Sequence, residues 1–160
     1  MAVGSAWLAK QNEVTLQGKY KIIDGDSLVV NGQEIRLLGI DAPEYRQTCT
    51  FQNGKTYECG KQSRLHLVKL AKSGKLNCTG WEEDKYQRML AVCKAGDIEV
   101  NAQMVKDGWA ISYGDYEGEE AHAREFASGV WQGGFDSPKT WRENTRDAHS
   151  ASWLLKLSPW

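Results

Sequence analysis

The chain has 160 residues, of which 41% are hydrophobic and 26% are charged, as expected for one globular domain. No apolar run approaches the ~20 residues of a membrane-spanning helix. The net charge is −1, with 11 basic and 7 acidic side chains in residues 1–75 but 9 and 14 in residues 76–160. Proteins that coat nucleic acid by counterion release are strongly basic, so this charge balance excludes that class.

Three β-strands are predicted in the first 40 residues. Val14–Asp24 is extended in character, and the apolar runs Ser27–Val30 and Gln33–Ile40 flank Asn31-Gly32, the strongest short hairpin signal. Alternation with a period of two directs Arg36 away from the core. The hairpin side chains that then face inward are Leu28, Val30, Ile35 and Leu37.

A helix and two further strands follow a long polar loop, which we expect to run from Pro43 to Glu58. Gly60–Lys72 has apolar residues at helical spacing and predicts a helix. Lys75–Trp81 and Arg88–Lys94 predict two strands joined by a polar turn.

The remaining residues predict shorter elements. Val100–Asp107 and Gly118–Ser128 are expected helices, and Asp136–Pro138 is expected to cap a short turn carrying Trp141. The apolar cluster Trp153–Leu157 is expected either to dock or to belong to a tail.

The order of the predicted elements indicates the fold class. Five strands, with a helix between the third and the fourth and trailing helices, are typical of an OB-type barrel. We therefore expect an α+β fold, a five-stranded OB-fold barrel with about three helices packed on it. The expected organisation is an N-terminal extension (1–13), the barrel domain (14–142) and a C-terminal tail (143–160).

The four cysteines do not have the CxxC spacing of zinc sites. The midpoint between Cys78 and Cys93 falls in the turn between the last two predicted strands, so a hairpin places these residues opposite each other, within disulfide reach. Cys49 and Cys59 then close the polar loop. The alternative is four reduced, buried thiols in a cytosolic protein, but the even count favours disulfides.

Disulfides imply an oxidising compartment, so we expect an exported protein, periplasmic or extracellular. Residues 1–10 lack the charged and apolar regions of a signal peptide. We therefore expect that a signal or anchor segment has been removed from this chain.

Carboxylates gather at the open end of the first predicted hairpin. Asp24–Ser27 precedes one of its strands and Asp41–Glu44 follows the other. Hard oxygen ligands without Cys or His select Ca²⁺ or Mg²⁺, and arginine suits bidentate phosphate binding. The pattern indicates metal-assisted phosphodiester hydrolysis, although each motif alone is also typical of a turn, a salt bridge or a helix cap. The side chains that can converge there are Asp26, Arg36, Asp41 and Glu44.

Three motifs, in order along the chain, resemble those of the staphylococcal nuclease (thermonuclease) family. They are Asp24–Leu28, Ile35–Glu44 and Asp84–Ala91, and shorter matches extend the likeness over about residues 18–142. The resemblance implies a Ca²⁺-dependent endonuclease that cleaves the P–O5′ bond of DNA or RNA and leaves 3′-phosphates. The cysteine pairs are also similar to those of exported bacterial members.

The resemblance implies roles for individual residues around the metal. Asp26 and Asp41 would bind one Ca²⁺ together with the backbone carbonyl of Ala42, and Asp24 would support this metal site. Glu44 would act as the general base or orient the attacking water.

Other residues would contact the substrate. Arg36 and Arg88 would bind the scissile phosphate and stabilise the charge of the transition state, and Tyr86 and Tyr113 are candidate contacts to the nucleotide. Gln87 stands where the family has glycine. If this position requires a positive φ, glutamine is strained there and Arg88 is aimed differently.

Two functions from different classes stay open. The first is a monomeric Ca²⁺-dependent nuclease whose substrate is DNA, RNA or both. The second is a non-catalytic nuclease-like module that binds a partner, which Gln87 and the acidic second half of the chain favour. Because some bacterial relatives are linked to exopolysaccharide (succinoglycan) biosynthesis, that context is a further alternative.

Overall fold

The computed structural model describes residues 12–146. The main sheet contains β1 (Val14–Gln17), β2 (Tyr20–Ile22), β3 (Ser27–Val30), β4 (Gln33–Leu37), β8 (Leu76–Glu83), β9 (Met89–Ala95) and β10 (Ile98–Glu99). The helices are α2 (Cys59–Ala71), α3 (Val100–Lys106), α4 (Glu117–Glu125), the 3₁₀ helix η1 (Gly129–Gln132) and a helix of residues 138–146. The short strands are β5 (Ile40–Asp41), β6 (Cys49–Phe51), β7 (Thr56–Tyr57), β11 (Ile111–Ser112) and β12 (Gly133–Gly134).

The main sheet is curled. Its strand order is β1-β8-β9-β4-β3-β2, with β10 beside β9, so β1 and β2 are its two edges. Only Gly18 and Lys19 separate these edge strands in the chain, and Gly18 has a φ of 121°, a backbone conformation that favours glycine. Because so short a connection joins both edges, the sheet must bend toward closure. The expected α+β, OB-fold-like architecture is confirmed.

Two predicted strands are each divided in the structure. Val14–Asp24 forms β1 and β2, and Gln33–Ile40 forms β4 and the start of β5, with Gly39 between them at a φ of 82°. The barrel therefore contains more and shorter strands than the five predicted ones. The polar loop was also expected to lack strands, but β6 and β7 form a hairpin within it, around a turn that contains Asn53-Gly54.

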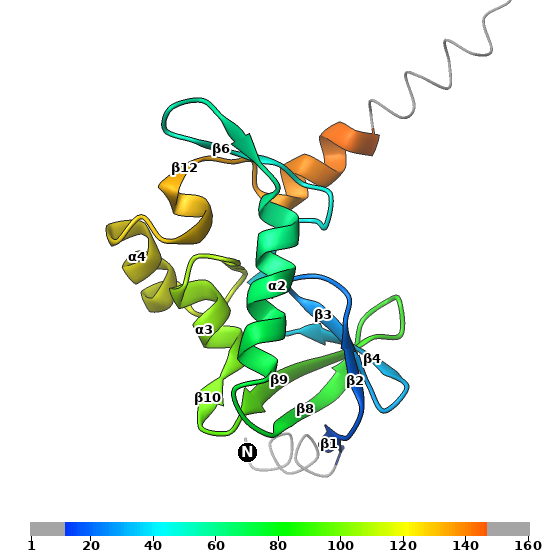
Figure 1. The fold of residues 1–160 in the computed structure, drawn as a ribbon. Coiled ribbons are helices and arrows are strands. Elements are labelled where there is room, and N and C mark those ends of the chain that lie inside the picture. The colour runs from blue at the N-terminus through cyan, green and yellow to red at the C-terminus, as the bar shows by residue number, and fades with distance from the viewer. Residues whose placement is uncertain (1–11, 147–160) are drawn as a thin grey trace, which may run out of the picture.

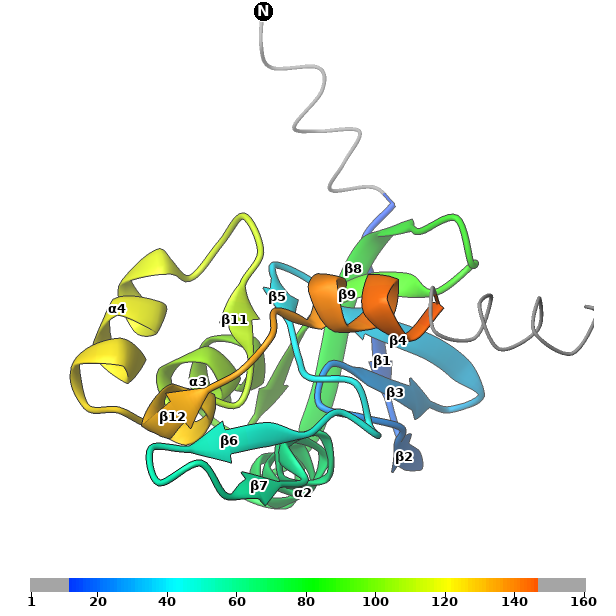
Figure 2. The ribbon, with the colours of Figure 1, turned by 90° about the horizontal axis from the view of Figure 1, so that it is seen from above.

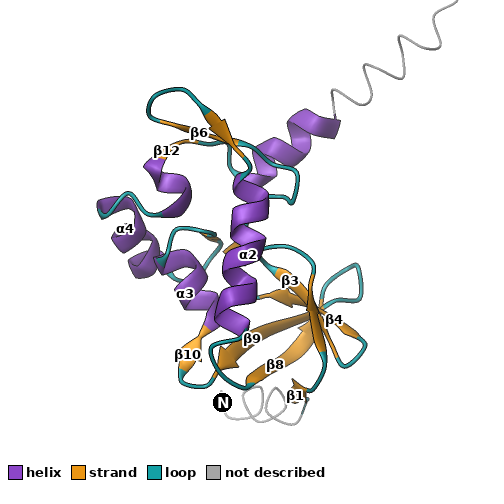
Figure 3. Ribbon diagram, viewed as in Figure 1, coloured by secondary structure: helices purple, strands orange, loops and turns teal. Residues whose placement is uncertain are grey.

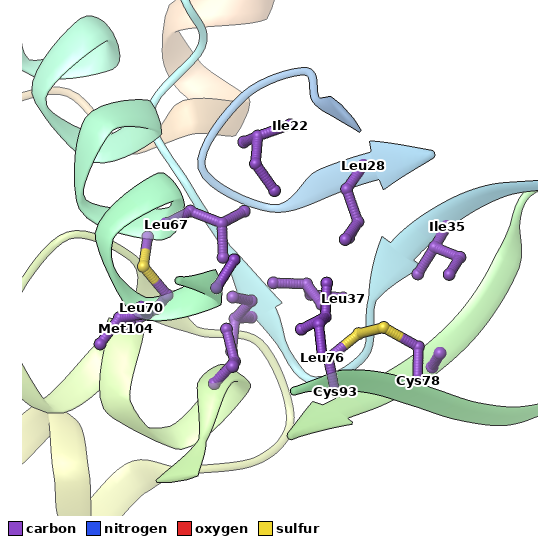
Figure 4. Close-up of a cluster of buried hydrophobic side chains, with 14 of the residues drawn as sticks. Ile22, Leu28, Ile35, Leu37, Leu67, Leu70, Leu76, Cys78, Cys93 and Met104 are labelled. Atoms are coloured by element: carbon purple, nitrogen blue, oxygen red, sulfur yellow. A yellow bond between two sulfur atoms is a disulfide. The ribbon is translucent and has the colours of Figure 1, made fainter. Parts of the chain in front are cut away.

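The helices cover one side of the curled sheet, as Figure 1 and the secondary-structure colours of Figure 3 show. Helices α2 and α3 both pack against β9. Their buried side chains Leu67, Leu70 and Met104 meet the inward face of the β3/β4 hairpin in the core of Figure 4. The four hairpin residues that were predicted to face inward, Leu28, Val30, Ile35 and Leu37, are all buried.

The turns and crosslinks predicted for this domain are present. Asn31 and Gly32 have φ values of 51° and 84°, which is the signature of a type I′ hairpin turn. Cys78 pairs with Cys93 across β8 and β9, and the two form a disulfide. The second disulfide, Cys49–Cys59, ties β6 to the start of α2.

The end of the described chain differs from the expected short turn. Ser137 Oγ accepts a hydrogen bond from the backbone N–H of Thr140 at 3.1 Å, which confirms the predicted cap. Trp141, however, lies in the helix of residues 138–146, which spans the expected start of the tail at 143. The predicted apolar cluster 153–157 lies outside the described residues. Within residues 12–146, no helix has the length and apolar character required to cross a membrane.

Two glycines offer a matched test of how tightly α2 holds the loop that carries Glu44. Gly60 and Gly118 are each the second residue of their helix. A Cβ on Gly60 would lie 1.8 Å from the Glu44 carbonyl oxygen, whereas nothing lies within 4 Å of one on Gly118. We expect Gly60→Ala to lower the free energy of unfolding by about 1–3 kcal/mol through steric overlap. Gly118→Ala should instead raise it by up to about 1 kcal/mol.

Urea denaturation of both variants measures this difference. Equal stabilisation by the two substitutions would show that α2 does not hold the loop by this close approach.

Candidate active site

The open end of the β3/β4 hairpin brings the predicted acidic segments together. Ser27 pairs with Arg36 across the hairpin, and the Leu37 N–H donates to the carbonyl of Asp26 at 2.8 Å. Gly25 permits the close approach of this turn to α2, because a Cβ there would lie 1.9 Å from Ser63 Oγ. The turn that carries Asp26 is therefore fixed from two sides.

Arg36 joins the two aspartates that the sequence singled out. Its Nη1 lies 2.6 Å from Asp26 Oδ2 and its Nη2 lies 3.2 Å from Asp41 Oδ1. Both aspartates are buried, and Asp26 Oδ2 also accepts the backbone N–H of Ala42 at 2.7 Å. Burial raises the pKa of Asp26 well above its ordinary value, although Arg36 opposes this effect.

A second arginine, Arg142, completes the cluster and was not predicted from the sequence. Its Nη1 donates to Glu44 Oε1 at 2.7 Å, and its guanidinium lies 3.4–3.5 Å from the oxygens of Asp41. Burial lowers the pKa of Arg142, but the carboxylates of Glu44 and Asp41 outweigh this effect and raise the pKa above its ordinary value. Ion pairs thus connect Asp26, Arg36, Asp41, Arg142 and Glu44.

Asp24 supports this cluster through the turn itself. Its Oδ1 accepts the backbone N–H of Asp26 at 3.1 Å and the hydroxyl of Ser27 at 2.7 Å. The Ser27 hydroxyl therefore helps to hold the carboxylates of Asp24 and Asp26 in place.

Gln47 fixes the loop that carries Glu44, and it too was missed from the sequence. It is fully buried. Its Oε1 accepts the Glu44 N–H at 3.1 Å, and its Nε2 donates to the carbonyl of Asp136 at 2.8 Å. Gln47 thereby ties the Glu44 loop to the segment before the helix of residues 138–146. Because Gln47 and Asp136 lie 89 positions apart in the chain, sequence spacing does not indicate this contact.

The Ca²⁺ that the family resemblance implies can be tested against these donors. Within residues 12–146, no group of three or more His, Cys, Asp or Glu side chains is placed to hold a metal ion. The predicted ligands, however, are two carboxylates and one carbonyl. Asp26 and Asp41 already face one common cation, the Arg36 guanidinium, and the Ala42 backbone is hydrogen-bonded to Asp26. This set of hard oxygens fits a divalent cation that keeps water ligands.

Arg88 stands apart from the ion-paired cluster. Its Nε donates to Asp84 Oδ2 at 2.8 Å, and its guanidinium lies 5.4 Å from the centre of the Tyr86 ring. Gln87 has a φ of 64°, so the residue that replaces glycine does adopt the left-handed conformation. The parallel pairing of Ile35 with Met89 nevertheless places Arg88 next to β4.

The two tyrosines proposed to contact a nucleotide are exposed. Tyr86 is 67% exposed and Tyr113 is 69% exposed. The backbone N–H of Tyr113 donates to the carbonyl of Gly39 at 2.9 Å, which places this residue beside the strand of Asp41. Both rings are accessible to a ligand.

Comparison with known proteins identifies the family of this chain. The family model described as "Staphylococcal nuclease homologue" matches residues 34–132. This chain belongs to the staphylococcal nuclease homologue family. The matched residues include Arg36, Asp41, Glu44 and Arg88, whereas Arg142 lies beyond them.

Curated relatives of this chain differ in length and name. The "Uncharacterized endonuclease" of Haemophilus influenzae is 31% identical over 138 residues, which are 79% of this chain and 72% of that protein. The "Succinoglycan biosynthesis protein ExoI" of Rhizobium meliloti is 30% identical over 122 residues, 72% of this chain and 64% of that protein. The "Probable staphylococcal-like nuclease CAN4" of Oryza sativa is 29% identical over 81% of this chain but only 26% of that protein. The chain thus spans less than two thirds of the last two relatives.

The raised pKa of Asp26 predicts a pH-dependent stability. The pKa of Asp26 is higher in the folded protein than in the unfolded chain, where it is about 4. Between these two pKa values, ionisation of Asp26 therefore lowers the free energy of unfolding as pH rises. Asp26→Asn removes this cost. Its stability relative to wild type should grow by about 1.4 kcal/mol per pH unit within that window and then level off.

Urea denaturation in EDTA at a series of pH values measures this effect, with the exposed Asp97→Asn as the matched control. A constant stability difference between Asp26→Asn and wild type over pH 4–8 would contradict the assignment.

The positive φ of Gln87 predicts that glycine is better tolerated there. Gln87→Gly should raise the free energy of unfolding by up to about 1 kcal/mol, because it removes the left-handed strain of a residue with a Cβ. Gln87→Ala keeps the Cβ and should give no such gain. Thermal unfolding distinguishes the two, and an equal gain in both variants would rule out backbone strain as the cause.

Proposed function

We propose that the protein is a Ca²⁺-dependent phosphodiesterase that hydrolyses DNA or RNA at the P–O5′ bond and leaves 3′-phosphates. One observation carries the proposal: Asp26, Arg36 and Asp41 are ion-paired at the open end of the β3/β4 hairpin, and Arg142 links Glu44 to Asp41. Membership in a nuclease family supports the general activity. The endonuclease name of the Haemophilus influenzae relative agrees with it.

In this mechanism, Glu44 takes a proton from water as the water oxygen attacks phosphorus. The P–O5′ bond breaks, the 5′ oxygen leaves and takes up a proton from solvent, and the phosphate stays on the 3′ side. Arg36 and Arg88 bind the non-bridging oxygens and stabilise the added negative charge. For Arg88 this requires its guanidinium to exchange Asp84 for the phosphate, and solvent reaches the pair, because 24% of the Arg88 side chain and 17% of the Asp84 side chain are exposed.

Asp26, Asp41 and the Ala42 carbonyl would hold the Ca²⁺, which when bound would stabilise negative charge on the phosphate oxygens. Asp24 would keep Asp26 oriented through the turn. The three carboxylates of the cluster outnumber its two guanidinium groups. A divalent cation bound there would favour the ionised form of Asp26, against the effect of burial on its pKa.

The substrate is a nucleic acid, DNA, RNA or both, with Tyr86 and Tyr113 as nucleotide contacts. Both tyrosine rings are exposed, Tyr113 beside the strand of Asp41 and Tyr86 next to Arg88. The two disulfides support an exported protein, since such bonds persist in oxidising compartments. We propose that it acts there as a monomer.

A non-catalytic binding module is the second candidate. It is favoured by the pairing of functional groups within the chain, because Arg142 contacts Glu44 and Asp84 contacts Arg88. The name of the ExoI relative adds exopolysaccharide biosynthesis as a context for such a module.

Glu44→Gln separates the two candidates. With plasmid DNA and single-stranded RNA as substrates, wild type should cleave with Ca²⁺ and not with EDTA, and Glu44→Gln should be slower by about 10²–10⁴-fold because the general base is lost. The matched control is Glu34→Gln, an exposed glutamate of the same hairpin, which should keep wild-type activity. The products should have free 5′-hydroxyl ends. A polynucleotide kinase should therefore label them without prior phosphatase treatment.

The same assay tests the metal affinity. Asp26→Asn should cleave more slowly than wild type, and a higher Ca²⁺ concentration should partly restore its rate. Absence of Ca²⁺-dependent cleavage, with Glu44→Gln no slower than wild type, would favour the binding module.

A further inference from the structure

A groove of about 480 Å³ lies next to Glu44. Its walls are the loop after Glu44, with Tyr45 and Arg46, and the helix of residues 138–146, with Trp141 and Arg142. In Figure 2 this helix is orange and begins beside β5, the strand of Asp41. The volume lies in the range of sites for small organic ligands, roughly 300–1,000 Å³.

The two walls of the groove are held in a fixed relation. Gln47 hydrogen-bonds both the Glu44 N–H and the carbonyl of Asp136, so one buried side chain connects the walls at their base. Arg142 connects them a second time through its 2.7 Å hydrogen bond to Glu44. Such a preformed groove costs little ordering entropy when a ligand binds.

Aromatic and cationic groups line this groove together. Tyr45 is 45% exposed, and Trp141 is half-buried. Among the described residues, neither ring stacks on another aromatic ring. Arg46, Arg142 and Arg146 line the same space, and among residues 12–146 Glu44 is the only acidic side chain of the lining. Flat rings beside guanidinium groups are the combination that binds the bases and phosphates of single-stranded nucleic acid.

We propose that this groove is a subsite for single-stranded nucleic acid, in which a base one or two positions from the scissile phosphate stacks on Trp141 or Tyr45. The inference rests on the proposed nuclease function. Glu44 belongs both to the groove and to the catalytic cluster, so a strand that enters the groove passes directly to the reacting phosphate. The groove is separate from the nucleotide contacts proposed at Tyr86 and Tyr113.

The aromatic walls also define which nucleic acid fits. A base within a duplex is already stacked on its neighbours and paired, so its faces are not available to an aromatic side chain. A single strand offers each base without that cost. The subsite therefore favours single-stranded DNA or RNA, and single-stranded regions of a longer substrate, over intact duplex.

Binding without hydrolysis tests the subsite directly. The probe is a fluorescein-labelled 12-residue oligothymidylate, measured by fluorescence anisotropy in EDTA. Trp141→Ala should weaken binding roughly 5- to 100-fold, as loss of one stacking ring does. Trp81→Ala, which removes an exposed tryptophan from β8 outside the groove, should leave it unchanged. Tyr45→Ala, on the opposite wall, keeps the test decisive if circular dichroism shows that Trp141→Ala does not fold.

Salt dependence tests the arginines of the groove. Arg46→Gln should weaken binding and reduce the slope of log K against log salt by about 0.7, the value for one phosphate contact to a single strand. An unchanged slope together with unchanged affinity in folded Trp141→Ala and Tyr45→Ala would overturn the proposal. Equal affinity of wild type for duplex and single strand would overturn it as well.

Hydrolysis separates this inference from the proposed function. Trp141→Ala should lower kcat/KM for the oligonucleotide, yet stay within about twofold of wild type on bis(p-nitrophenyl) phosphate, which is too small to reach both sites. Equal losses on both substrates would indicate a structural role and overturn the subsite. If wild type hydrolyses neither substrate, the nuclease function fails, while the anisotropy measurements still decide whether the groove binds single strands.

Discussion

The candidate site depends on the contacts of one buried carboxylate, that of Asp26. It lies beside Arg36, accepts the N–H of Ala42 and is oriented by Asp24, so it connects the turn before β3 to β4 and to the end of β5. This position has an energetic cost, because burial raises the pKa of Asp26 and works against its charge. A fold optimised for stability alone would not keep a desolvated carboxylate there, which agrees with a functional reason for it.

Much of this architecture could be predicted because local signals agree with it. Asn31-Gly32 sets a hairpin whose alternating side chains fill the core, and that hairpin brings both acidic segments to one end. The register of β8 and β9 follows from the position of their turn, which is why Cys78 and Cys93 could be paired. The motifs Asp24–Leu28 and Asp84–Ala91, and the first part of Ile35–Glu44, lie on these locally determined elements.

The parts that were missed depend on contacts that local patterns do not encode. Arg142 reaches Asp41 across 101 positions of the chain, and Gln47 reaches Asp136 across 89. Both follow from where the last described helix docks, which neither periodicity nor capping determines. The β6/β7 hairpin is a different case, because Asn53-Gly54 between Thr50 and Thr56 was a visible turn signal. Glycine also explains the divided strands, because a positive φ at Gly18 interrupts a run that otherwise looks continuous.

The parallel pairing of β4 with β9 has a consequence for when the site comes into existence. Ile35 pairs with Met89, and α2 and β8 lie between these two residues in the chain. Contacts of such high sequence separation form slowly, because a long loop must close before they contribute. The β3/β4 hairpin can form as soon as it is synthesised, but it carries Arg36 without Arg88. A growing or truncated chain that ends before β9 therefore contains only half of the guanidinium pair, so the phosphate binding proposed for both arginines would require the complete barrel.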